Sequence, residues 1–334
     1  MRDRARTWRG PDRRPGSAML RWGWTPLLVG ALLSVAASPP APAKVIDIVT
    51  VGASPMAVAV NLGRGYAANL SSDTVSVFNT LNHNVVDTVP VGDAPVAVAA
   101  NPFRHTIYVA NRDSGTVSVI DSVSDGVANT VRVGGSPQYL AVHPSGLDVY
   151  VTSSGTNTVA VINAVSNSVV STVAVGAQPA GVASSPSGGL MYVANSASGT
   201  VSVINSAEKK VSETITVGGN PTSIAVTPDG SQIFVVDRIR DAVIPVDLVT
   251  KVPAAPIWVG DQPSGVVISS SPSGVWGYVT NLGDGTVSQF DTESKRVVHT
   301  VRVGVRPSGL AAAPLSGDVY VANAGSDNVS VLRS

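Results

Sequence analysis

One short phrase, Val-Gly-x-x-Pro, recurs seven times along the 334-residue chain at nearly constant spacing. Successive copies are 40, 42, 42, 42, 42 and 44 residues apart. They begin at Val51, Val91, Val133, Val175, Val217, Val259 and Val303. A second phrase, of the form Tyr-Val-Ala-Asn, follows each copy, at Tyr66, Tyr108, Tyr150, Tyr192, Phe234, Tyr278 and Tyr320. A period of about 40–50 residues made of short strands is typical of β-propeller blades.

The repeat that begins at Val175 shows how one blade is built. Segments rich in small and β-branched residues alternate with turns that contain Pro, Gly, Ser or Asn. The predicted strands of this repeat cover 180–184, 190–194, 200–204 and 211–217. Four short strands joined by turns make one blade. The chain is therefore predicted to be an all-β, seven-bladed propeller with four-stranded blades.

One part of the repeat has a constant length, and another part varies. From the aromatic residue of each second strand to the next Val-Gly the distance is always 25 residues. From the Pro to that aromatic residue it is 13 in five repeats, 11 in the first and 15 in the sixth. All length variation is thus predicted to lie in the turn between strands one and two, on one rim of the ring.

The two ends of the repeat region complement each other. The last repeat holds only three predicted strands, the third at 328–332. Residues 45–52, Val-Ile-Asp-Ile-Val-Thr-Val-Gly, match the fourth strand at 85–92, Val-Val-Asp-Thr-Val-Pro-Val-Gly. An unpaired strand edge would invite association with other chains. We therefore predict that the N-terminal strand pairs with the last blade and closes the ring.

The first 43 residues differ in composition from the repeats. Residues 1–25 hold seven Arg, residues 27–37 form an apolar run, and Ala-Pro-Ala ends at Ala43. These are the parts of a secretory signal peptide. Eleven apolar residues are fewer than the ~20 that a membrane-spanning helix needs. We expect cleavage before Lys44, with 35–37 as a weaker second site.

The leader sets the predicted domain organisation and localisation. Met19 is an alternative start, because residues 19–43 alone make a signal of ordinary length. Residues 1–43 are then the signal peptide, and residues 44–334 form a single propeller domain. We expect a secreted, periplasmic or envelope-associated protein whose mature chain has no membrane span.

The composition limits the chemistry available to this chain. It has no Cys, which removes disulfides, thiol catalysis and Cys-ligated metals. Once the seven Arg and two Asp of residues 1–25 are set aside, 15 Lys and Arg face 20 Asp and Glu, a net charge of −5. A mildly acidic domain without clustered basic residues disfavours nucleic acid as a partner. No phosphate loop, nucleophile elbow or haem-attachment motif occurs, so no metal or cofactor is predicted.

The repeated phrases resemble a known family. Tyr278-Val279-Thr280-Asn281, with Val-Gly-x-x-Pro before it, is similar to the YVTN family of β-propeller repeats, and residues 114–121 carry the flanking Ser-Gly-Thr-Val-Ser-Val-Ile-Asp. The likeness spans residues 45–332. It implies relatives among archaeal surface-layer proteins and bacterial periplasmic propellers of unknown or DNA-binding role. More distantly, it implies lactonase and haem d1 nitrite-reductase propellers. The motif builds blades, so it implies a fold and leaves function open.

The residues that recur in every blade have an architectural interpretation. The Tyr rings are expected to pack between blades, and the Asn side chains to satisfy turn backbone. The four His are interpreted as turn or surface residues: His83 between strands three and four, His299 in a fourth strand, and His105 and His143 in or beside first turns of adjacent blades. His105 and His143 could face each other, but no carboxylate stands at a matching position.

Departures from the repeat are the better candidates for ligand binding. The loops between fourth and first strands and between second and third strands surround the channel mouth of propellers, and symmetry accounts for most of their residues. The departing residues are Asp93, Arg112, Asp113, Tyr139, Arg238, Arg240, Asp241, Asp261, Gln262 and Arg306. They predict a mouth of mixed charge for a small polar ligand or a partner's loop. A solvated rim with local ion pairs is the alternative.

The function expected from the sequence is a monomeric, non-enzymatic binding module for a protein, glycan or envelope component. Three alternatives stay open. A lactonase-like hydrolase needs His, Asp, Glu and Arg converging at the mouth, and the His positions argue against it. An accessory subunit of a periplasmic redox system would hold haem or quinone on another chain. Binding of single-stranded DNA needs a basic channel with stacking aromatics.

Overall fold

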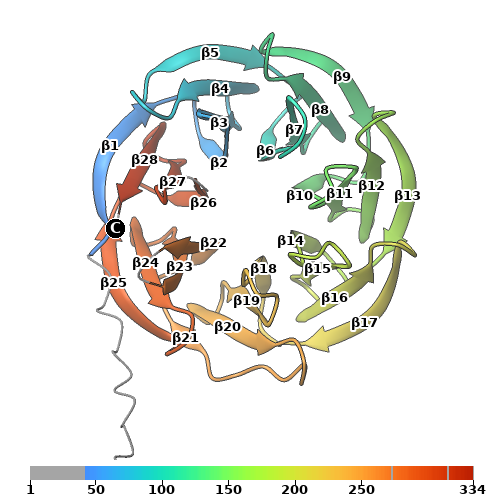
Figure 1. The fold of residues 1–334 in the computed structure, drawn as a ribbon, viewed down its shortest axis with the longest axis vertical. Helices are drawn as coiled ribbons and strands as arrows, with labels where there is room; N and C mark the ends of the chain where they lie inside the picture. Colours follow the sequence, from blue (N-terminus) through green and yellow to red (C-terminus); the bar gives the residue numbers. More distant parts are fainter. Residues whose placement is uncertain (1–41, 272–273, 314–315, 334) are drawn as a thin grey trace, which may run out of the picture. The chain divides into compact units, whose positions relative to one another are not determined.

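The computed structural model describes residues 42–271, 274–313 and 316–333. These residues form 28 strands in seven four-stranded antiparallel sheets, and no helix occurs among them. The sheets stand as blades around a central axis (Figure 1). The prediction of an all-β, seven-bladed propeller is confirmed. The predicted signal peptide lies, apart from Pro42 and Ala43, outside the described residues.

Each blade runs from an inner first strand to an outer fourth strand. The first strands are β2 (Pro55–Asn61), β6 (Pro95–Ala100), β10 (Pro137–Val142), β14 (Pro179–Ser184), β18 (Pro221–Val226), β22 (Pro263–Ser271) and β26 (Pro307–Ala312). The second strands are β3 (Arg64–Asn69), β7 (Thr106–Asn111), β11 (Asp148–Ser153), β15 (Leu190–Asn195), β19 (Gln232–Asp237), β23 (Gly274–Asn281) and β27 (Val319–Asn323).

The outer two strands of each blade complete the set. The third strands are β4 (Thr74–Asn79), β8 (Thr116–Asp121), β12 (Thr158–Asn163), β16 (Thr200–Asn205), β20 (Ala242–Asp247), β24 (Thr286–Asp291) and β28 (Asn328–Arg333). The fourth strands are β5 (Val85–Pro90), β9 (Gly126–Arg132), β13 (Ser168–Ala174), β17 (Lys210–Thr216), β21 (Ile257–Trp258), β25 (Arg296–Arg302) and β1 (Lys44–Thr50). Blades one to six follow chain order from β2 to β25, and blade seven combines β26–β28 with β1.

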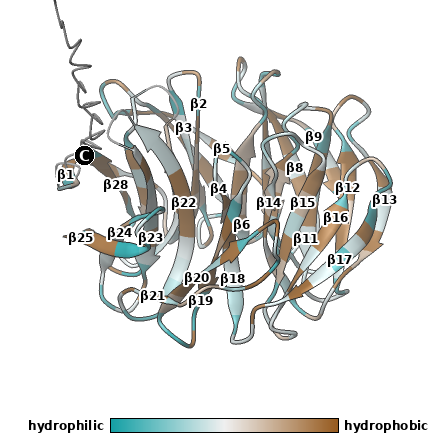
Figure 2. Cartoon of the chain, turned by 60° about the horizontal axis from the view of Figure 1, so that its bottom comes forward, coloured by the Kyte–Doolittle hydropathy of each residue, from teal (hydrophilic) through white to brown (hydrophobic). Residues whose placement is uncertain are grey.

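The hydrophobic core lies between neighbouring blades. Tyr108 of blade two is fully buried against Leu140, Val149 and Ile162 of blade three. Repeated contacts of this kind account for the recurring aromatic residue, because each blade can bury its faces only against its neighbours. Hydrophobic colour runs along the strands and also reaches several of the turns (Figure 2).

The recurring Asn binds mainly the third strand, although in blade seven it also satisfies loop backbone as expected, because Asn323 Oδ1 accepts from Gly304 N at 3.1 Å. Asn111 Nδ2 donates to Thr116 Oγ1 at 3.1 Å and to Ser118 Oγ at 2.9 Å, so it ties the second strand to the third rather than to turn backbone. A Cβ on Gly92 would lie 2.7 Å from Asn111 Nδ2, which explains why Gly follows Val in the first phrase. The same pair of bonds forms at Asn69, Asn195 and Asn281. Asn323 donates to Asn328 Oδ1 and Ser330 Oγ instead.

The N-terminal strand lies against the last blade. β1 pairs antiparallel with β28, from Lys44 opposite Arg333 to Thr50 opposite Asn328. The backbone N–H of Ser54 donates to Asp327 Oδ1 at 2.8 Å, which continues the contact into the next loop. On the channel side, Ser308 Oγ of blade seven donates to Met56 O of blade one at 2.8 Å. Blades seven and one are thus joined at both their outer and inner edges.

Blade five departs from the others in its outer strand. β21 has only two residues, although the spacing between the flanking motifs is the same as in every repeat. Pro253 and Pro256 precede it, and Pro has no N–H for the ladder. Constant length therefore does not ensure a full fourth strand.

The predicted length variation is found in the first turn of the blades. In blade six the two extra residues extend the hairpin of β22 and β23, whose pairing reaches Ser271 and Gly274. In blade one the turn shrinks to Leu62 and Gly63, both with positive φ, between paired Asn61 and Arg64. No helix long and apolar enough to cross a membrane was found in the described ranges.

Candidate binding site at the channel mouth

Two faces of the propeller differ in their loops. The Val-Gly rim consists of the loops between fourth and first strands, such as 51–54, and the turns between second and third strands, such as 70–73. The opposite face carries the turns after first and third strands, such as 101–105 and 122–125. The first strands surround the axis between the two faces (Figure 1).

A cavity of about 250 Å³ opens at the mouth of the channel on the Val-Gly rim. The residue that follows the Pro of each repeat contributes one side of it. These residues are Met56, Val96, Gln138, Ala180, Thr222, Ser264 and Ser308. Of these residues, only Gln138 stands beside a predicted site residue, Tyr139, and the only trace of the ring in the sequence is its constant position after each Pro. The ring is apolar toward blades one, two and four and polar elsewhere.

Arg112 and Tyr139 are the two predicted site residues that line this cavity. Arg112 Nε donates to Asp113 Oδ1 at 2.8 Å, and this bond raises the pKa of Arg112 and lowers that of Asp113. Burial raises the pKa of Tyr139. The cavity therefore holds a guanidinium with a rim carboxylate beside it and a neutral phenol.

Tyr139 also lines a second cavity of about 580 Å³, which runs down the channel. That cavity is bordered by first strands of all seven blades, with Val, Ala, Leu and Ile prevailing. Tyr139 thus stands between a polar mouth and an apolar channel. Thr222 Oγ1 is buried and has no hydrogen-bond partner among the described residues. A buried hydroxyl without a partner is a feature that a ligand atom could satisfy.

Predicted residues in the fourth-to-first loops lie away from the mouth. Asp93, Asp261 and Gln262 are exposed, and so is Arg306. The backbone of this loop takes a positive φ before the Pro, 51° at Gln262 and 52° at Arg306. Asp93 O accepts a bond from Asp113 N at 3.2 Å, so the loop rests on the second-to-third turn of its own blade. None of these four lines the mouth cavity.

Blade five holds the remaining predicted residues. Asp241 Oδ1 accepts from Gln262 N at 2.9 Å, as Asp73 and Asp327 accept from Ala94 and Ser54 in other blades, so Asp241 has a structural role. Arg238 and Arg240 are exposed. They are not among the lining residues of the mouth. The structure therefore brings Arg112, Asp113 and Tyr139 together and leaves the other seven on the outer part of the rim.

The departure at Arg240 has a local explanation. Asp237 replaces the recurring Asn and is buried, with Arg240 Nη1 3.4 Å from its Oδ2. Asp cannot donate to the third strand, and Ala242 and Ile244 stand where blades one, two, four and six have Thr and Ser. The three changes are consistent with one another, because they remove the donor and its acceptors together.

Three of the four His lie on the opposite face. His143 Nε2 donates to Gly188 O at 2.7 Å, while its Nδ1 accepts from Ser145 N at 3.1 Å, which joins blades three and four. His83 Nδ1 lies 2.7 Å from Asp47 Oδ2. No hydrogen bond joins His105 to His143 among the described residues, and both ring nitrogens of His143 are engaged by other groups. No group of three or more metal-ligating residues was found in the described part of the chain.

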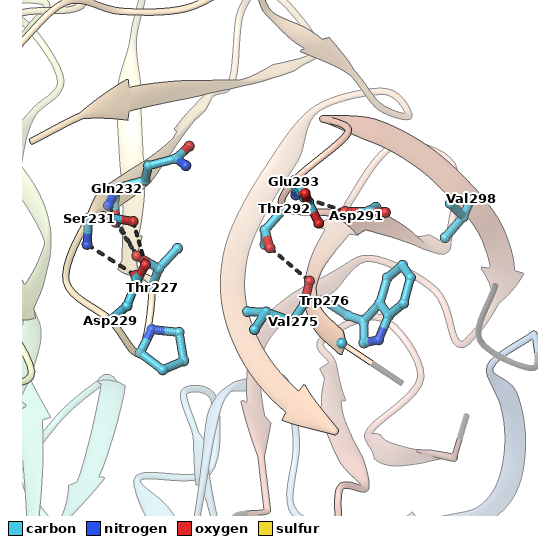
Figure 3. Close-up of a pocket in the computed structure, with 12 residues that line it drawn as sticks. Thr227, Asp229, Ser231, Gln232, Val275, Trp276, Asp291, Thr292, Glu293 and Val298 are labelled. Atoms are coloured by element: carbon cyan, nitrogen blue, oxygen red, sulfur yellow. Dashed lines mark hydrogen bonds between the residues drawn. The ribbon is translucent and has the colours of Figure 1, made fainter. Parts of the chain in front are cut away.

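A larger cavity of about 620 Å³ lies on the opposite face between blades five and six (Figure 3). Two of its carboxylates bind their own turns: Asp229 Oδ2 accepts from Ser231 Oγ at 2.7 Å, and Asp291 Oδ1 accepts from Glu293 N at 2.7 Å. Trp276 also lines the cavity and is largely buried.

Gln232 Oε1 is buried without a hydrogen-bond partner among the described residues, as Thr222 Oγ1 is at the mouth. The mouth also holds the guanidinium of Arg112, and no Arg or Lys of the described ranges lines the larger cavity, so the mouth is the better candidate.

Comparison with known proteins supports the fold and no more. No protein-family model matches the sequence, and no curated protein matches it. Among solved structures, a chain of "Kuenenia stuttgartiensis Hydrazine Synthase" superposes with a TM-score of 0.77 at 23% identity, over 86% of this chain and 97% of that chain. The shared feature is the propeller. The resemblance to YVTN repeats stays a prediction.

Proposed function

We propose that this protein is an exported, non-enzymatic binding module that captures a polar group at the channel mouth on the Val-Gly rim. The observation that carries the proposal is the cavity of about 250 Å³ where Arg112 and Tyr139 converge with the hydroxyl of Thr222. Its size suits a small polar ligand or one side chain of a partner's loop better than a whole macromolecule.

The lining residues favour binding over catalysis. No His, Asp or Glu lines the mouth cavity in the described part of the chain. A hydrolase needs a general base within hydrogen-bond reach of the reacting atom. Arg112, Tyr139 and Thr222 can donate hydrogen bonds to an acceptor such as a carboxylate, and apolar Met56 and Val96 exclude water beside them.

The proposal is tested by comparing two variants of the exported protein. Immobilised wild type is incubated with cell-envelope extract beside Arg112→Ala/Tyr139→Phe/Thr222→Val at the mouth and Arg238→Ala/Arg306→Ala on the outer rim. We expect the mouth variant to lose specifically retained components and the outer-rim variant to keep them. Equal retention by all three proteins would dismiss the mouth as the site.

Two further measurements address the other functions. Lactone hydrolysis above background, abolished by His105 or His143 substitution, would favour a hydrolase. Intact-mass analysis of the exported protein locates the cleavage. Ala43 is buried in a core cluster, so we expect it to be retained, with cleavage after Ala37 rather than before Lys44. A mass that begins at Lys44 would contradict this.

A further inference from the structure

The opposite face of blades one to three carries an unusual set of exposed side chains. Each blade places one large apolar residue in its first-to-second turn and another in its third-to-fourth turn. These tip residues are Leu62, Leu81, Phe103, Val123, Leu147 and Val165, with exposed fractions from 49% at Leu147 to 89% at Leu81. Single exposed apolar residues are common, but a group of six on one face marks an interaction surface.

The tip residues are neighbours across blade boundaries. Leu62 of blade one and Val123 of blade two line the same cavity of about 220 Å³. A Cβ on Gly146 would lie 3.0 Å from the ring of Phe103, so Phe103 of blade two rests on the turn that leads to Leu147 of blade three. These two contacts link the tips of blade one to those of blade two, and the tips of blade two to the first turn of blade three.

The turns that carry the tips are fixed to one another by polar contacts. Asn61 Nδ2 donates to Asn101 O at 3.3 Å, and Asn101 Nδ2 donates to Gly146 O at 2.9 Å. His143 continues the series to Gly188 of blade four. The bases of the turns are thus held in place, and the apolar residues stand on a rigid frame.

Blade four places Ala207 at the position of Leu81, and blade six places Glu293 there. Blade five has Val249 at this position, 86% exposed, but its first-to-second turn holds Asp229 and no large apolar residue, so among the described residues only blades one to three carry both tips.

The carboxylates near the tip residues are already engaged, whereas the guanidinium of Arg104 can bind an anionic group. The carboxylates of these turns are engaged: Asp125 pairs with Arg64, Asp148 pairs with Lys209, and Asp121 Oδ1 accepts from Val123 N at 2.7 Å. Arg104, next to Phe103, is exposed and has no ion-pair partner within the described residues. An apolar surface with a free cation beside it fits a bilayer that contains anionic headgroups.

The N-terminal part of the chain reaches the propeller at this same face. β1 starts at Lys44, opposite Arg333 at the end of a third strand, and third strands end on the opposite face. β1 therefore enters blade seven on the face that carries the tip residues.

We propose that the opposite face of blades one to three is a membrane-contact surface, with the six tip residues inserted at the headgroup level of a lipid bilayer. Separate apolar side chains on projecting turns suit a deformable lipid surface better than a protein partner, whose interface needs a continuous packed patch. This orientation leaves the Val-Gly rim and the channel mouth directed away from the membrane, so the proposal is independent of the ligand at the mouth.

The absence of Cys allows a direct test with the full chain. Single-site variants Leu81→Cys, Ala207→Cys and Val305→Cys carry a polarity-sensitive fluorophore and are mixed with vesicles of phosphatidylcholine and phosphatidylglycerol. We expect the label at position 81 to shift to the blue and to be quenched by lipid-borne quenchers. The labels at 207, on blade four, and at 305, on the Val-Gly rim, should stay aqueous. An aqueous signal at position 81 on vesicle-bound protein overturns the proposal, as does a failure to bind vesicles.

A second variant tests whether the tip residues themselves make the contact with the membrane. In the Val165→Cys background, Leu81→Ser/Phe103→Ser/Val123→Ser should reduce the fraction of label in the lipid environment by about tenfold. Arg104→Gln should remove the gain that phosphatidylglycerol gives over phosphatidylcholine alone. The replaced side chains are exposed, so thermal unfolding should hardly change. An unchanged signal contradicts the proposal. Loss of a protein partner without any vesicle contact shows a protein interface instead.

Discussion

Blades five and seven both depart from the repeat, in opposite ways. Blade five is made from one continuous segment, yet its outer strand is reduced to two residues, Ile257–Trp258. Blade seven has a full outer strand of seven residues, Lys44–Thr50, but takes it from the other end of the chain. The comparison teaches that a short outer strand is tolerated where the chain is continuous. Where the chain is not continuous, the outer strand is what joins the ends.

The largest expected effect comes from removing the outer strand of blade seven. Deletion of residues 42–50 leaves β28 unpaired and exposes the surface that Val49, 2% exposed, now covers. We expect a loss of unfolding free energy on the order of 5 kcal/mol and a tendency to associate through β28. Urea unfolding and light scattering measure the two effects. Trp258→Ser in β21, where the side chain is 66% exposed, is the matched control and should change little.

A smaller loss of stability is expected from substituting the buried polar residue that ends the second strand, which is Asn323 in blade seven and Asp237 in blade five. Asn323 donates to Asn328 and Ser330 in blade seven, so Asn323→Ala should cost about 2 kcal/mol. Asp237→Asn in blade five should also destabilise, because Ala242 and Ile244 offer the new amide no side-chain acceptor.

The triple variant Asp237→Asn/Ala242→Thr/Ile244→Ser tests the coupling within blade five. It rebuilds the set of hydrogen bonds found in the regular blades, so it should recover part of the stability that Asp237→Asn loses. Chemical denaturation of the single and triple variants gives the comparison. A triple variant less stable than the single one would show that the three residues do not act together.

Acid should weaken blade seven through its buried ion pair. Burial raises the pKa of Asp318, but the bonds from Arg333 Nε and Nη2, at 2.7 and 2.8 Å, outweigh burial and leave the pKa below its ordinary 3.8. The carboxylate therefore contributes stability above pH 3.8 that is lost as the pH falls toward the folded-state value. Asp318→Asn should flatten the acid limb of a stability profile. A profile identical to that of the wild type would contradict this assignment.

The smallest effect at neutral pH concerns the aromatic residue of the second strand. Blade seven has Tyr320 where blade five has Phe234, and the Tyr320 hydroxyl makes one long bond, 3.4 Å, to Thr80 O. Tyr320→Phe should therefore cost less than about 1 kcal/mol near pH 7. Burial raises the pKa of Tyr320 from 10.0 to about 12, so its contribution is lost as the pH rises above 10.0. The variant should show a shallower alkaline limb, and an equally steep one would contradict the assignment.

Much of the fold could be predicted from the sequence because the repeat fixes it locally. Each Pro starts a first strand and each Asn ends a second strand in the regular blades, as at Pro95 and Asn111. The match between residues 45–52 and 85–92 identified β1 as a fourth strand by pattern alone. The short fourth strand of blade five was harder to predict. Pro253 and Pro256 indicate a broken strand, but the spacing of the flanking motifs is the same as in blades with a full strand.

The candidate site was predicted only in part. Arg112 and Tyr139 depart from the repeat and line the mouth, whereas Arg240 departs because Asp237 lacks its usual partners. A departure from a repeat can serve either a ligand or the blade, and sequence alone does not separate the two. The ring of residues after each Pro, including Gln138 and Thr222, varies among blades and so shows no motif. Its convergence depends on the seven-fold closure of the chain.

Closure by β1 is the central claim, and amide hydrogen exchange tests it most directly. If β1 pairs with β28 as described, the amides of the β1–β28 ladder should exchange as slowly as those between β27 and β28. They should open together with the whole ring in a single cooperative step. Rapid exchange across residues 45–50, while β27 and β28 stay protected, would show an open ring and contradict the account.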